Sequence, residues 1–329
     1  RLGRSGLKVI FLSAGDIKNC VTCADAVAAA EKAFLIYESK DFLMPDRMHL
    51  DFERNTYLLM PCLGSDYFST KLVTVYPGNA GSDFPVVDGV VVLNDMRTGS
   101  PLAFLNGMIV TALRTGAAAA VSVKYLAPES AGKLGIVGTG AQAFYQVLLT
   151  ASVRKLTDLT VLDLRRENAL AFIEKISAHL PGVEIRLAEC AEDLLQSSEI
   201  VITATTSDRP VLPECEELLR GKHYVGIGSF KPEAREYPEA MYKLIEKVYI
   251  DTEFARKESG DLLFPLKQKW IAEEQIQTLG SYILTDGTTS ARAQTTFFKS
   301  VGMALFDLVL AQVIYEKAIA LKLGTVLTL

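Results

Sequence analysis

The glycine-rich stretch at 138–143, which reads Gly-Thr-Gly-Ala-Gln-Ala, constrains the fold of this chain more than any other feature. It follows the apolar run Lys133–Val137 and opens a segment with helical apolar spacing. At such a strand-to-helix turn Gly138 permits the tight turn, Gly140 lets the backbone approach a pyrophosphate, and the small Ala143 lets helix and strand pack closely. The exposed amides at the helix start attract the anion. The stretch therefore predicts a dinucleotide-binding turn.

From Lys133 onward the chain alternates β-branched runs with amphipathic segments, as parallel strands joined by crossover helices do. The expected helices include 141–152 and 166–180, which have the length needed to cover a sheet. The expected strands are Lys133–Gly138, Leu159–Leu164, Glu184–Ala188, Glu199–Thr205, Tyr224–Ser229 and Lys247–Asp251. This pattern predicts an α/β fold with a Rossmann-type doubly wound sheet.

Residues 1–120 have a different pattern, which predicts an α+β domain with antiparallel strands. A helix is expected over Asp25–Ser39, and turn signals separate the apolar runs as hairpins require. The expected strands are Met48–Phe52, Thr56–Met60, Phe68–Tyr76, Val86–Leu93 and Pro101–Asn106. A last helix, Lys299–Leu321, is expected to pack back on this domain. We therefore predict two domains, residues 1–120 with 305–329 and residues 121–304.

Composition excludes several classes of protein. The 34 basic and 39 acidic residues give a net charge of -5, without the cationic excess that binding a run of phosphates requires. No apolar run reaches the roughly 18 residues of a membrane span, and the N-terminal run is too short for a secretory signal. We therefore expect a cytoplasmic protein with no nucleic acid and no membrane partner. The five cysteines, with Cys20 and Cys23 at a helix entry, predict packing rather than disulfides, and the three scattered histidines predict no metal site.

Asp163, at the end of the second expected strand of the Rossmann domain, predicts the choice of cofactor. A carboxylate there can accept hydrogen bonds from the adenosine ribose and repel a 2′-phosphate, which favours NAD over NADP. Arg165 and Arg166 leave the alternative open, because a guanidinium in this loop could grip that phosphate. They could equally be solvated residues at a helix start.

Three cations in the N-terminal domain, Arg47, Lys71 and Arg114, lie among apolar neighbours rather than on charged helix faces. An unpaired charge in such surroundings is costly, so each is expected to have an anionic partner. A small carboxylate substrate would supply one, with arginine giving a bidentate grip and lysine a point charge or a proton. The alternative is ordinary salt bridges to acids such as Asp46, Asp51 or Asp88.

Taken together, these segments resemble the ornithine cyclodeaminase and mu-crystallin family over essentially the whole chain. The matching motifs are MPDR at 44–47, STKLVTVYPGN at 69–79, PLAFLNG and ALRTGAAAA at 101–107 and 112–120, GTGAQA at 138–143, ARKESGDLL at 255–263 and TTFFKSVGMA at 295–304. The resemblance implies a homodimer whose subunits have a substrate-binding and dimerisation domain and an NAD(P)-binding Rossmann domain.

The resemblance also implies roles for individual residues. Arg47, Lys71 and Arg114 match positions that hold the substrate carboxylate, and Val301 lies at the substrate end. The implied cofactor contacts are the turn residues Gly138, Gly140, Ala141 and Gln142, the ribose side Asp163 and Arg165, Thr205 near the adenosine, the strand end Ile227, Gly228 and Ser229, and Ser300 near the nicotinamide.

Departures from the family pattern indicate which activity this chain has. Ornithine cyclodeaminases have an acidic residue where this chain has Leu58 and a proton-exchanging Asp where it has Phe230, and Val86 replaces a small hydroxyl residue. Cyclisation of ornithine needs proton transfer by such carboxylates. Archaeal alanine dehydrogenases of the family carry a basic residue at the Leu58 position, so that subgroup fits poorly too. The GSFKPEARE and KESGDLL segments are closer to mu-crystallin-like ketimine reductases.

The sequence therefore predicts an NAD(P)H-dependent reductase of a small cyclic imino acid, Δ1-pyrroline-2-carboxylate or Δ1-piperideine-2-carboxylate. In this reaction Arg47 and Arg114 clamp the carboxylate, while Lys71 orients it and protonates the imine. One alternative is a cyclodeaminase or amino-acid dehydrogenase in which Glu53 or Asp88 replaces the missing acids. Others are an opine-type synthase and a nicotinamide-dependent small-molecule binding protein.

Overall fold

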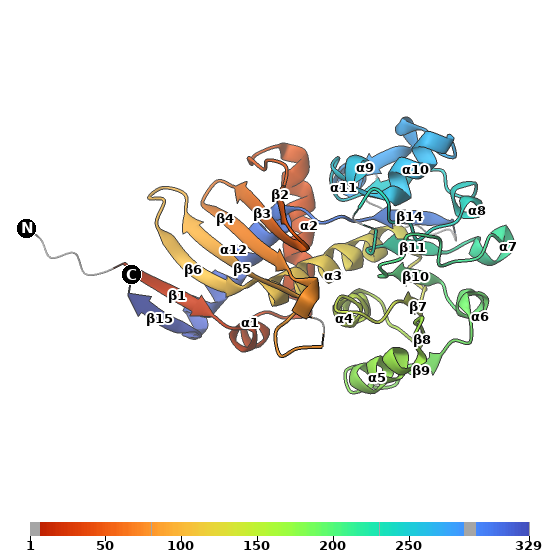
Figure 1. The fold of residues 1–329 in the computed structure, drawn as a ribbon, viewed down its shortest axis with the longest axis horizontal. Coiled ribbons are helices and arrows are strands. Elements are labelled where there is room, and N and C mark those ends of the chain that lie inside the picture. The colour runs from red at the N-terminus through yellow and green to blue at the C-terminus, as the bar shows by residue number, and fades with distance from the viewer. Residues whose placement is uncertain (1–6, 80, 230, 286–293, 329) are drawn as a thin grey trace, which may run out of the picture. The chain divides into compact units, whose positions relative to one another are not determined.

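The computed structural model describes residues 7–79, 81–229, 231–285 and 294–328. The chain divides into two compact units, one of residues 1–114 with 303–329 and one of residues 115–302 (Figure 1). The sequence placed its domain boundaries at 120/121 and 304/305, close to these divisions. The roles assigned to the two domains stay predictions at this point.

The first unit contains a seven-stranded sheet with the order β15-β1-β6-β5-β4-β3-β2. Neighbouring strands are antiparallel except β1 and β6, which are parallel. The strands are β1 (Lys8–Leu12), β2 (Met48–Phe52), β3 (Asn55–Leu63), β4 (Tyr67–Val75), β5 (Val87–Asp95), β6 (Pro101–Asn106) and β15 (Thr325–Thr328), and a short 3-10 helix η1 (Pro77–Asn79) follows β4. The five hairpin strands predicted from sequence are confirmed, whereas β1 and β15, which pair the two ends of the chain, were not predicted.

Three helices pack in this unit: α1 (Ala14–Cys20), α2 (Cys23–Ser39) and α12 (Ala304–Leu321). α1 and α2 each begin with a capping box, in which Ser13 bonds Asp16 and Thr22 bonds Asp25. Cys20 and Cys23 therefore end one helix and begin the next as free thiols, in agreement with the packing role expected for them. α12 packs against α2 and against β3, β4 and β5, as predicted for the last helix.

The predicted start of that helix at Lys299 was wrong. Residues Thr296–Lys299 form strand β14, whose Phe297 and Phe298 are fully buried, and the helix begins at Ala304. Between them Gly302 has a φ of 78°, a conformation that favours glycine and interrupts a helix. The KSVG segment is therefore a strand end and a loop, because buried aromatic pairing outweighs the helical spacing of the residues that follow.

The chain passes from the first unit to the second within α3 (Gly107–Leu126), a helix that the sequence patterns did not predict. Its alanines 117–120 are fully buried. A Cβ at Gly116 would lie 2.5 Å from the Tyr145 carbonyl oxygen, so only glycine permits this close packing against helix α4 (Ala143–Val153).

The second unit is a doubly wound α/β fold, as predicted. Its eight-stranded sheet has the order β13-β12-β14-β11-β10-β7-β8-β9, with parallel neighbours throughout. The strands are β7 (Lys133–Val137), β8 (Asp158–Leu162), β9 (Glu184–Leu187), β10 (Ile200–Thr203), β11 (His223–Gly226), β12 (Val248–Ile250), β13 (Ile276–Thr278) and β14. Strand order reverses between β7 and β10, and ligands of such sheets bind at the carboxyl ends of the strands beside this point.

Helices lie on both faces of this sheet, with α4 and α5 on one side of β7, β8 and β9 and α6 and α7 on the other (Figure 1). The remaining helices are α5 (Arg166–Ser177), α6 (Ala191–Gln196), α7 (Glu216–Leu219), α8 (Glu239–Tyr242), α9 (Ala255–Glu258), α10 (Gly260–Gln268), η2 (Glu273–Gln275) and α11 (Leu279–Thr285). Within the described ranges, none of the helices is long and apolar enough to cross a membrane.

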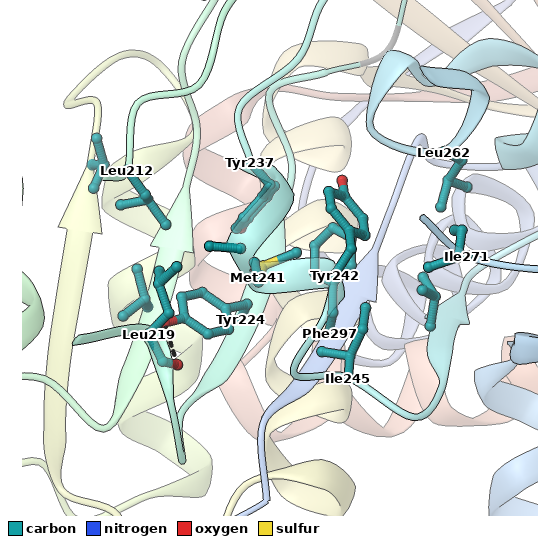
Figure 2. Packing of buried hydrophobic residues seen from close by; sticks show 14 of the residues in the cluster. Leu212, Leu219, Tyr224, Tyr237, Met241, Tyr242, Ile245, Leu262, Ile271 and Phe297 are labelled. Atoms are coloured by element: carbon teal, nitrogen blue, oxygen red, sulfur yellow. Dashed lines mark hydrogen bonds between the residues drawn. The ribbon is translucent and has the colours of Figure 1, made fainter. Parts of the chain in front are cut away.

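An aromatic cluster fills the core beside β11 and β14 (Figure 2). Tyr237 packs against Phe297 with ring centroids 4.6 Å apart, and Tyr224 and Tyr242 complete the cluster. The hydroxyl of buried Tyr224 donates to the Leu219 carbonyl oxygen at 2.8 Å. This core fixes the chain that follows β11, where candidate functional residues lie.

Candidate functional site

The glycine turn after β7 has the backbone geometry that its sequence predicts. Gly138 has a φ of 88°, and its amide donates to the Leu162 carbonyl oxygen at 2.8 Å. A Cβ at this position would lie 2.8 Å from the Ala204 carbonyl oxygen and 2.9 Å from Thr205 Cγ2. Glycine is therefore required at 138 by the protein itself, because the turn abuts the chain that follows β10.

Gly140 is in a different situation. A Cβ built on it meets no described protein atom within 4 Å, so packing inside the chain does not require glycine there. α4 begins two residues after Ala141, its N-cap Gln142 makes no side-chain capping bond, and the buried Gln142 Oε1 has no hydrogen-bond partner among the described residues. Ala143 is fully buried against the sheet. This open, uncapped helix start fits the pyrophosphate of a dinucleotide.

Asp163 follows β8 and closes the turn from the other side. Its Oδ2 accepts hydrogen bonds from the Thr139 amide at 2.8 Å and the Thr139 hydroxyl at 2.7 Å, and its Oδ1 accepts from the Arg165 amide at 2.9 Å. Burial acts to raise the pKa of Asp163, but these hydrogen bonds outweigh it and hold the pKa below its usual value. The carboxylate stays ionised, as repulsion of a 2′-phosphate requires.

The ends of β10 and β11 meet at a buried carboxylate that the sequence did not single out. Glu236 Oε1 accepts from the Thr205 amide and hydroxyl, both at 2.8 Å, and Oε2 accepts from the Gly228 amide at 2.9 Å. Ile227 donates its amide to the Thr203 carbonyl oxygen at 2.9 Å, which continues the ladder between the two strands. The structure therefore brings Thr205, Ile227 and Gly228 together.

Ser229 and Ser300 have hydroxyls that bond within the second unit. The Ser229 hydroxyl is buried, donates to the Ala234 carbonyl oxygen and lies 3.0 Å from the Ser259 hydroxyl. The Ser300 hydroxyl donates to Asp251 Oδ2 at 2.7 Å. The same oxygen accepts the Val301 and Gly302 amides at 3.1 and 2.7 Å, so Asp251 shapes the loop after β14. The cofactor and substrate roles of Ser229, Ser300 and Val301 stay predictions.

In the first unit Lys71 and Arg114 converge on Asp307, a residue of α12 that the sequence reading passed over. Lys71 Nζ lies 2.9 Å from Asp307 Oδ1 and 2.8 Å from Oδ2, and it also donates to the Thr111 hydroxyl at 3.3 Å. Arg114 Nε lies 3.3 Å from Asp307 Oδ1. The Lys71 and Asp307 side chains are 1% and 0% exposed, so this ion pair is dry.

Burial strongly disfavours the Lys71 ammonium and lowers its pKa from 10.5 to about 8. The charge of Asp307 opposes this shift, whereas the positive charges of Arg114 and Arg47 add to it. Arg47 itself is half-buried just before β2. Two of the three cations predicted from sequence, Lys71 and Arg114, share the single carboxylate of Asp307.

The alternative of ordinary salt bridges is confirmed for Lys71 and Arg114, but their acidic partner is Asp307 rather than the acids named from the sequence. Asp51 and Asp88 are exposed and bond the Thr56 hydroxyl and the Gly89 amide instead. A signal for Asp307 was present, because it is the one charged residue in the buried stretch 304–311 of α12. Its partner on β4 could not be inferred from spacing.

The departures from the family pattern lie in different surroundings. Leu58 is half-buried on β3, and Val86 is 36% exposed just before β5. Glu53, proposed as a replacement acid, is exposed in the turn between β2 and β3, where its φ is 55°. Phe230 lies outside the described residues. The acid that contacts Lys71 is Asp307, which was not among the replacement acids proposed from the sequence.

The fold and the turn define a doubly wound α/β protein of the dinucleotide-binding class with a separate α+β unit that carries the cationic cluster. The chain belongs to the ornithine cyclodeaminase/mu-crystallin family, which it matches over residues 8–322.

Relatives of known name support this assignment along the whole chain. A Δ1-pyrroline-2-carboxylate reductase of Bacillus thuringiensis subsp. konkukian is 33% identical, with 96% of this chain and 98% of the relative covered. The rat ketimine reductase mu-crystallin is 29% identical, with 93% and 96% covered.

Solved structures agree with this result. The Δ1-pyrroline-2-carboxylate reductase of Thermococcus litoralis, solved with NADH and L-proline, has a TM-score of 0.88 at 33% identity and covers 96% of this chain and 99% of its own. An archaeal alanine dehydrogenase dimer with bound NAD has a TM-score of 0.88 at 27% identity, with 98% and 99% covered.

Proposed function

We propose that this protein reduces a small cyclic imino acid, Δ1-pyrroline-2-carboxylate or Δ1-piperideine-2-carboxylate, to the corresponding cyclic amino acid with NADH or NADPH. The observation that carries the proposal is the buried Lys71–Asp307 pair, which Arg114 also contacts. Similarity to Δ1-pyrroline-2-carboxylate reductases and to a ketimine reductase supports the same substrate class.

The cationic cluster supplies the binding of the substrate carboxylate. Lys71 and Arg114 carry two positive charges against the one negative charge of Asp307, so an incoming carboxylate balances the second. Arg114 is 8% exposed, and a charge-assisted hydrogen bond in such a site is stronger than one in water. The arginines therefore hold the substrate in one orientation.

Lys71 supplies the proton. Reduction of the imine adds a hydride to the ring carbon and a proton to the nitrogen, and the bound reduced nicotinamide supplies the hydride. A buried ammonium with a pKa of about 8 donates a proton more readily than an ordinary lysine. Asp307 orients this ammonium, and Lys71 then recovers its proton from solvent.

The turn residues 138–143 would hold the pyrophosphate, and Asp163 would accept hydrogen bonds from the ribose. Because its carboxylate stays ionised, Asp163 supports NAD over NADP. The T. litoralis and archaeal relatives were solved with NADH and NAD, respectively.

We also propose a homodimer built on the open edges of the first unit's sheet. Edge strand β2 exposes Met48, Leu50 and Phe52 at 53%, 49% and 67%, and edge strand β15 exposes Val326 at 62%. Apolar side chains on an unpaired edge favour association with another strand. The alanine dehydrogenase relative is a dimer. Light scattering after size-exclusion chromatography should give twice the chain mass.

The test of the activity is the loss of reduced-nicotinamide absorbance when the purified protein meets Δ1-pyrroline-2-carboxylate, with NADH and NADPH in parallel. Rapid oxidation with proline as product is the expected result. No oxidation with either cyclic imino acid, combined with ammonia release from ornithine or cofactor reduction by alanine, would overturn it in favour of the cyclodeaminase or dehydrogenase alternative.

A further inference from the structure

Several charged side chains of the second unit are 0% exposed, and the function proposed above uses none of three of them, Glu236, Asp261 and Lys299. Lys299 ends β14, Glu236 ends the segment that follows β11, and Asp261 lies at the start of α10. Burying a charged side chain costs several kcal/mol of desolvation free energy. Well-packed apolar residues of similar size would often stabilise the core as well as these charged side chains do. Such groups therefore call for a functional explanation.

Glu236 links the ends of two neighbouring strands. Its two carboxylate oxygens accept three hydrogen bonds, two from Thr205 after β10 and one from the Gly228 amide after β11. A Cβ at Gly228 would lie 2.6 Å from Glu236 Oε1 and 2.1 Å from the Thr205 carbonyl oxygen, so glycine is needed for this approach. The Thr205 hydroxyl also accepts from the Ser207 amide at 3.2 Å, which fixes its orientation.

The backbone of Glu236 is held by a second buried carboxylate, that of Asp261. Asp261 Oδ1 accepts the Glu236 and Tyr237 amides at 2.8 and 3.3 Å, and Lys299 Nζ lies 3.4 Å from Asp261 Oδ2. The ring of Tyr237 lies in the aromatic core, next to Phe297 (Figure 2). The carboxylate therefore projects from a rigid base, although the segment that carries it is not a regular element.

The described residues of two sequence motifs form this base together, namely 228–229 and 231–236 of GSFKPEARE and 257–263 of KESGDLL. The Gly260 amide donates to the Lys231 carbonyl oxygen at 3.1 Å, and a Cβ at Gly260 would lie 2.2 Å from the Ala234 carbonyl oxygen. The Arg235 guanidinium lies 4.1 Å from the centre of the Phe264 ring. Both motifs therefore serve to place Glu236.

We propose that Glu236 is a positioning residue for the cofactor, which holds the ends of β10 and β11 in the conformation that binds the dinucleotide. The inference rests on the proposed use of NADH or NADPH. The ends of β10 and β11 lie on one side of the strand-order reversal, at the edge of the sheet where ligands of doubly wound folds bind. The Thr205 end also abuts the phosphate turn at Gly138. Glu236 reaches the cofactor only through these backbones.

Glu236→Gln tests the proposal with little change in shape. The amide nitrogen must face one of the donors whose hydrogen bonds Glu236 accepts, so at least one of the three hydrogen bonds is lost and the strand end that it held is released. The dissociation constant of NADH, followed by its fluorescence on the full-length protein, should therefore rise at least about tenfold. Glu233→Gln is the matched control, because it makes the same change on an exposed residue of the same segment.

Amide hydrogen exchange supplies a readout independent of turnover. The Thr205 and Gly228 amides should exchange faster in Glu236→Gln without cofactor, while amides of β7 and β8 keep their protection. A folded Glu236→Gln protein with wild-type NADH affinity would overturn the proposal. If that variant does not fold, Glu236→Asp decides, because it keeps the carboxylate but shortens its reach to the two strand ends. Weaker NADH binding at unchanged thermal stability supports the proposal, and wild-type affinity overturns it. If the wild-type protein binds neither NADH nor NADPH, the proposed function has failed instead.

Discussion

Lys71 Nζ lies 2.9 Å from Asp307 Oδ1 although 236 positions separate the two residues in the sequence. β4 supplies the lysine and α12 supplies the aspartate, and both are buried. Removing one partner of such a pair leaves an unpaired charge in a dry site. The pair therefore joins α12, the last helix of the chain, to strand β4 of the same unit.

Lys71→Met should remove the proton donor while keeping the length of the side chain. General acid catalysis contributes typically 10²–10⁴-fold, so we expect kcat/KM for imino acid reduction to fall by about that factor. NADH binding should stay within about twofold of wild type, because the phosphate turn belongs to the other unit and shares no contact partner with the Lys71 side chain in the described contacts. Stopped-flow absorbance and NADH fluorescence measure the two quantities. Unchanged turnover would remove Lys71 from the mechanism.

Activity should fall as the pH rises through about 8, because burial lowers the pKa of Lys71 to that value and only the ammonium donates a proton. Asp307 opposes this shift, so Asp307→Asn should lower the Lys71 pKa further and move the alkaline limb to lower pH. Profiles of kcat/KM against pH for the two proteins check this. An alkaline limb at the same pH in Asp307→Asn would show that Lys71 does not cause it.

Local patterns explain how much could be predicted from the sequence. The hairpin strands and the β7–α4 turn carry their own signals, alternating apolar residues and fixed glycines, so their positions were expected. The β1–β15 pairing was not, because it joins Lys8–Leu12 to the other end of the chain. Asp307 and Glu236 were missed for the same reason: each owes its role to a partner on another element.

Arg114→Lys should weaken substrate binding more than catalysis. Lysine keeps the charge but loses the fork that grips a carboxylate, so we expect KM for the imino acid to rise roughly tenfold with a smaller change in kcat. Arg97→Lys, on an exposed turn of the same unit, is the matched control. If kcat falls and KM is unchanged, the arginine acts in the transition state rather than in binding.

His223 should make the second unit sensitive to acid. Burial lowers its pKa from 6.5 to about 3, and its ring nitrogens bond the Ser122 hydroxyl at 3.2 Å and the Thr296 hydroxyl at 2.8 Å. Between these two values the unfolded chain binds a proton that the folded chain does not, so stability is full above pH 6.5 and is lost as the pH falls. The loss from this group amounts to about 2 kcal/mol between pH 7 and 5. Urea unfolding at both pH values should show a smaller difference in His223→Gln, and an equal difference would contradict the assignment.

Gly138 and Gly140 should respond to substitution in opposite ways. Gly138 has a φ of 88° and its Cβ would meet the chain after β10, so Gly138→Ala should lower the melting temperature. Gly140→Val meets no described protein atom close to its Cβ, so the melting temperature should stay near that of wild type. The added methyl groups would occupy the space into which a pyrophosphate must come, and NADH affinity should fall by roughly tenfold or more. Differential scanning fluorimetry with and without NADH separates these effects. A Gly140→Val protein that binds NADH as wild type does would show that the phosphate does not lie against this turn.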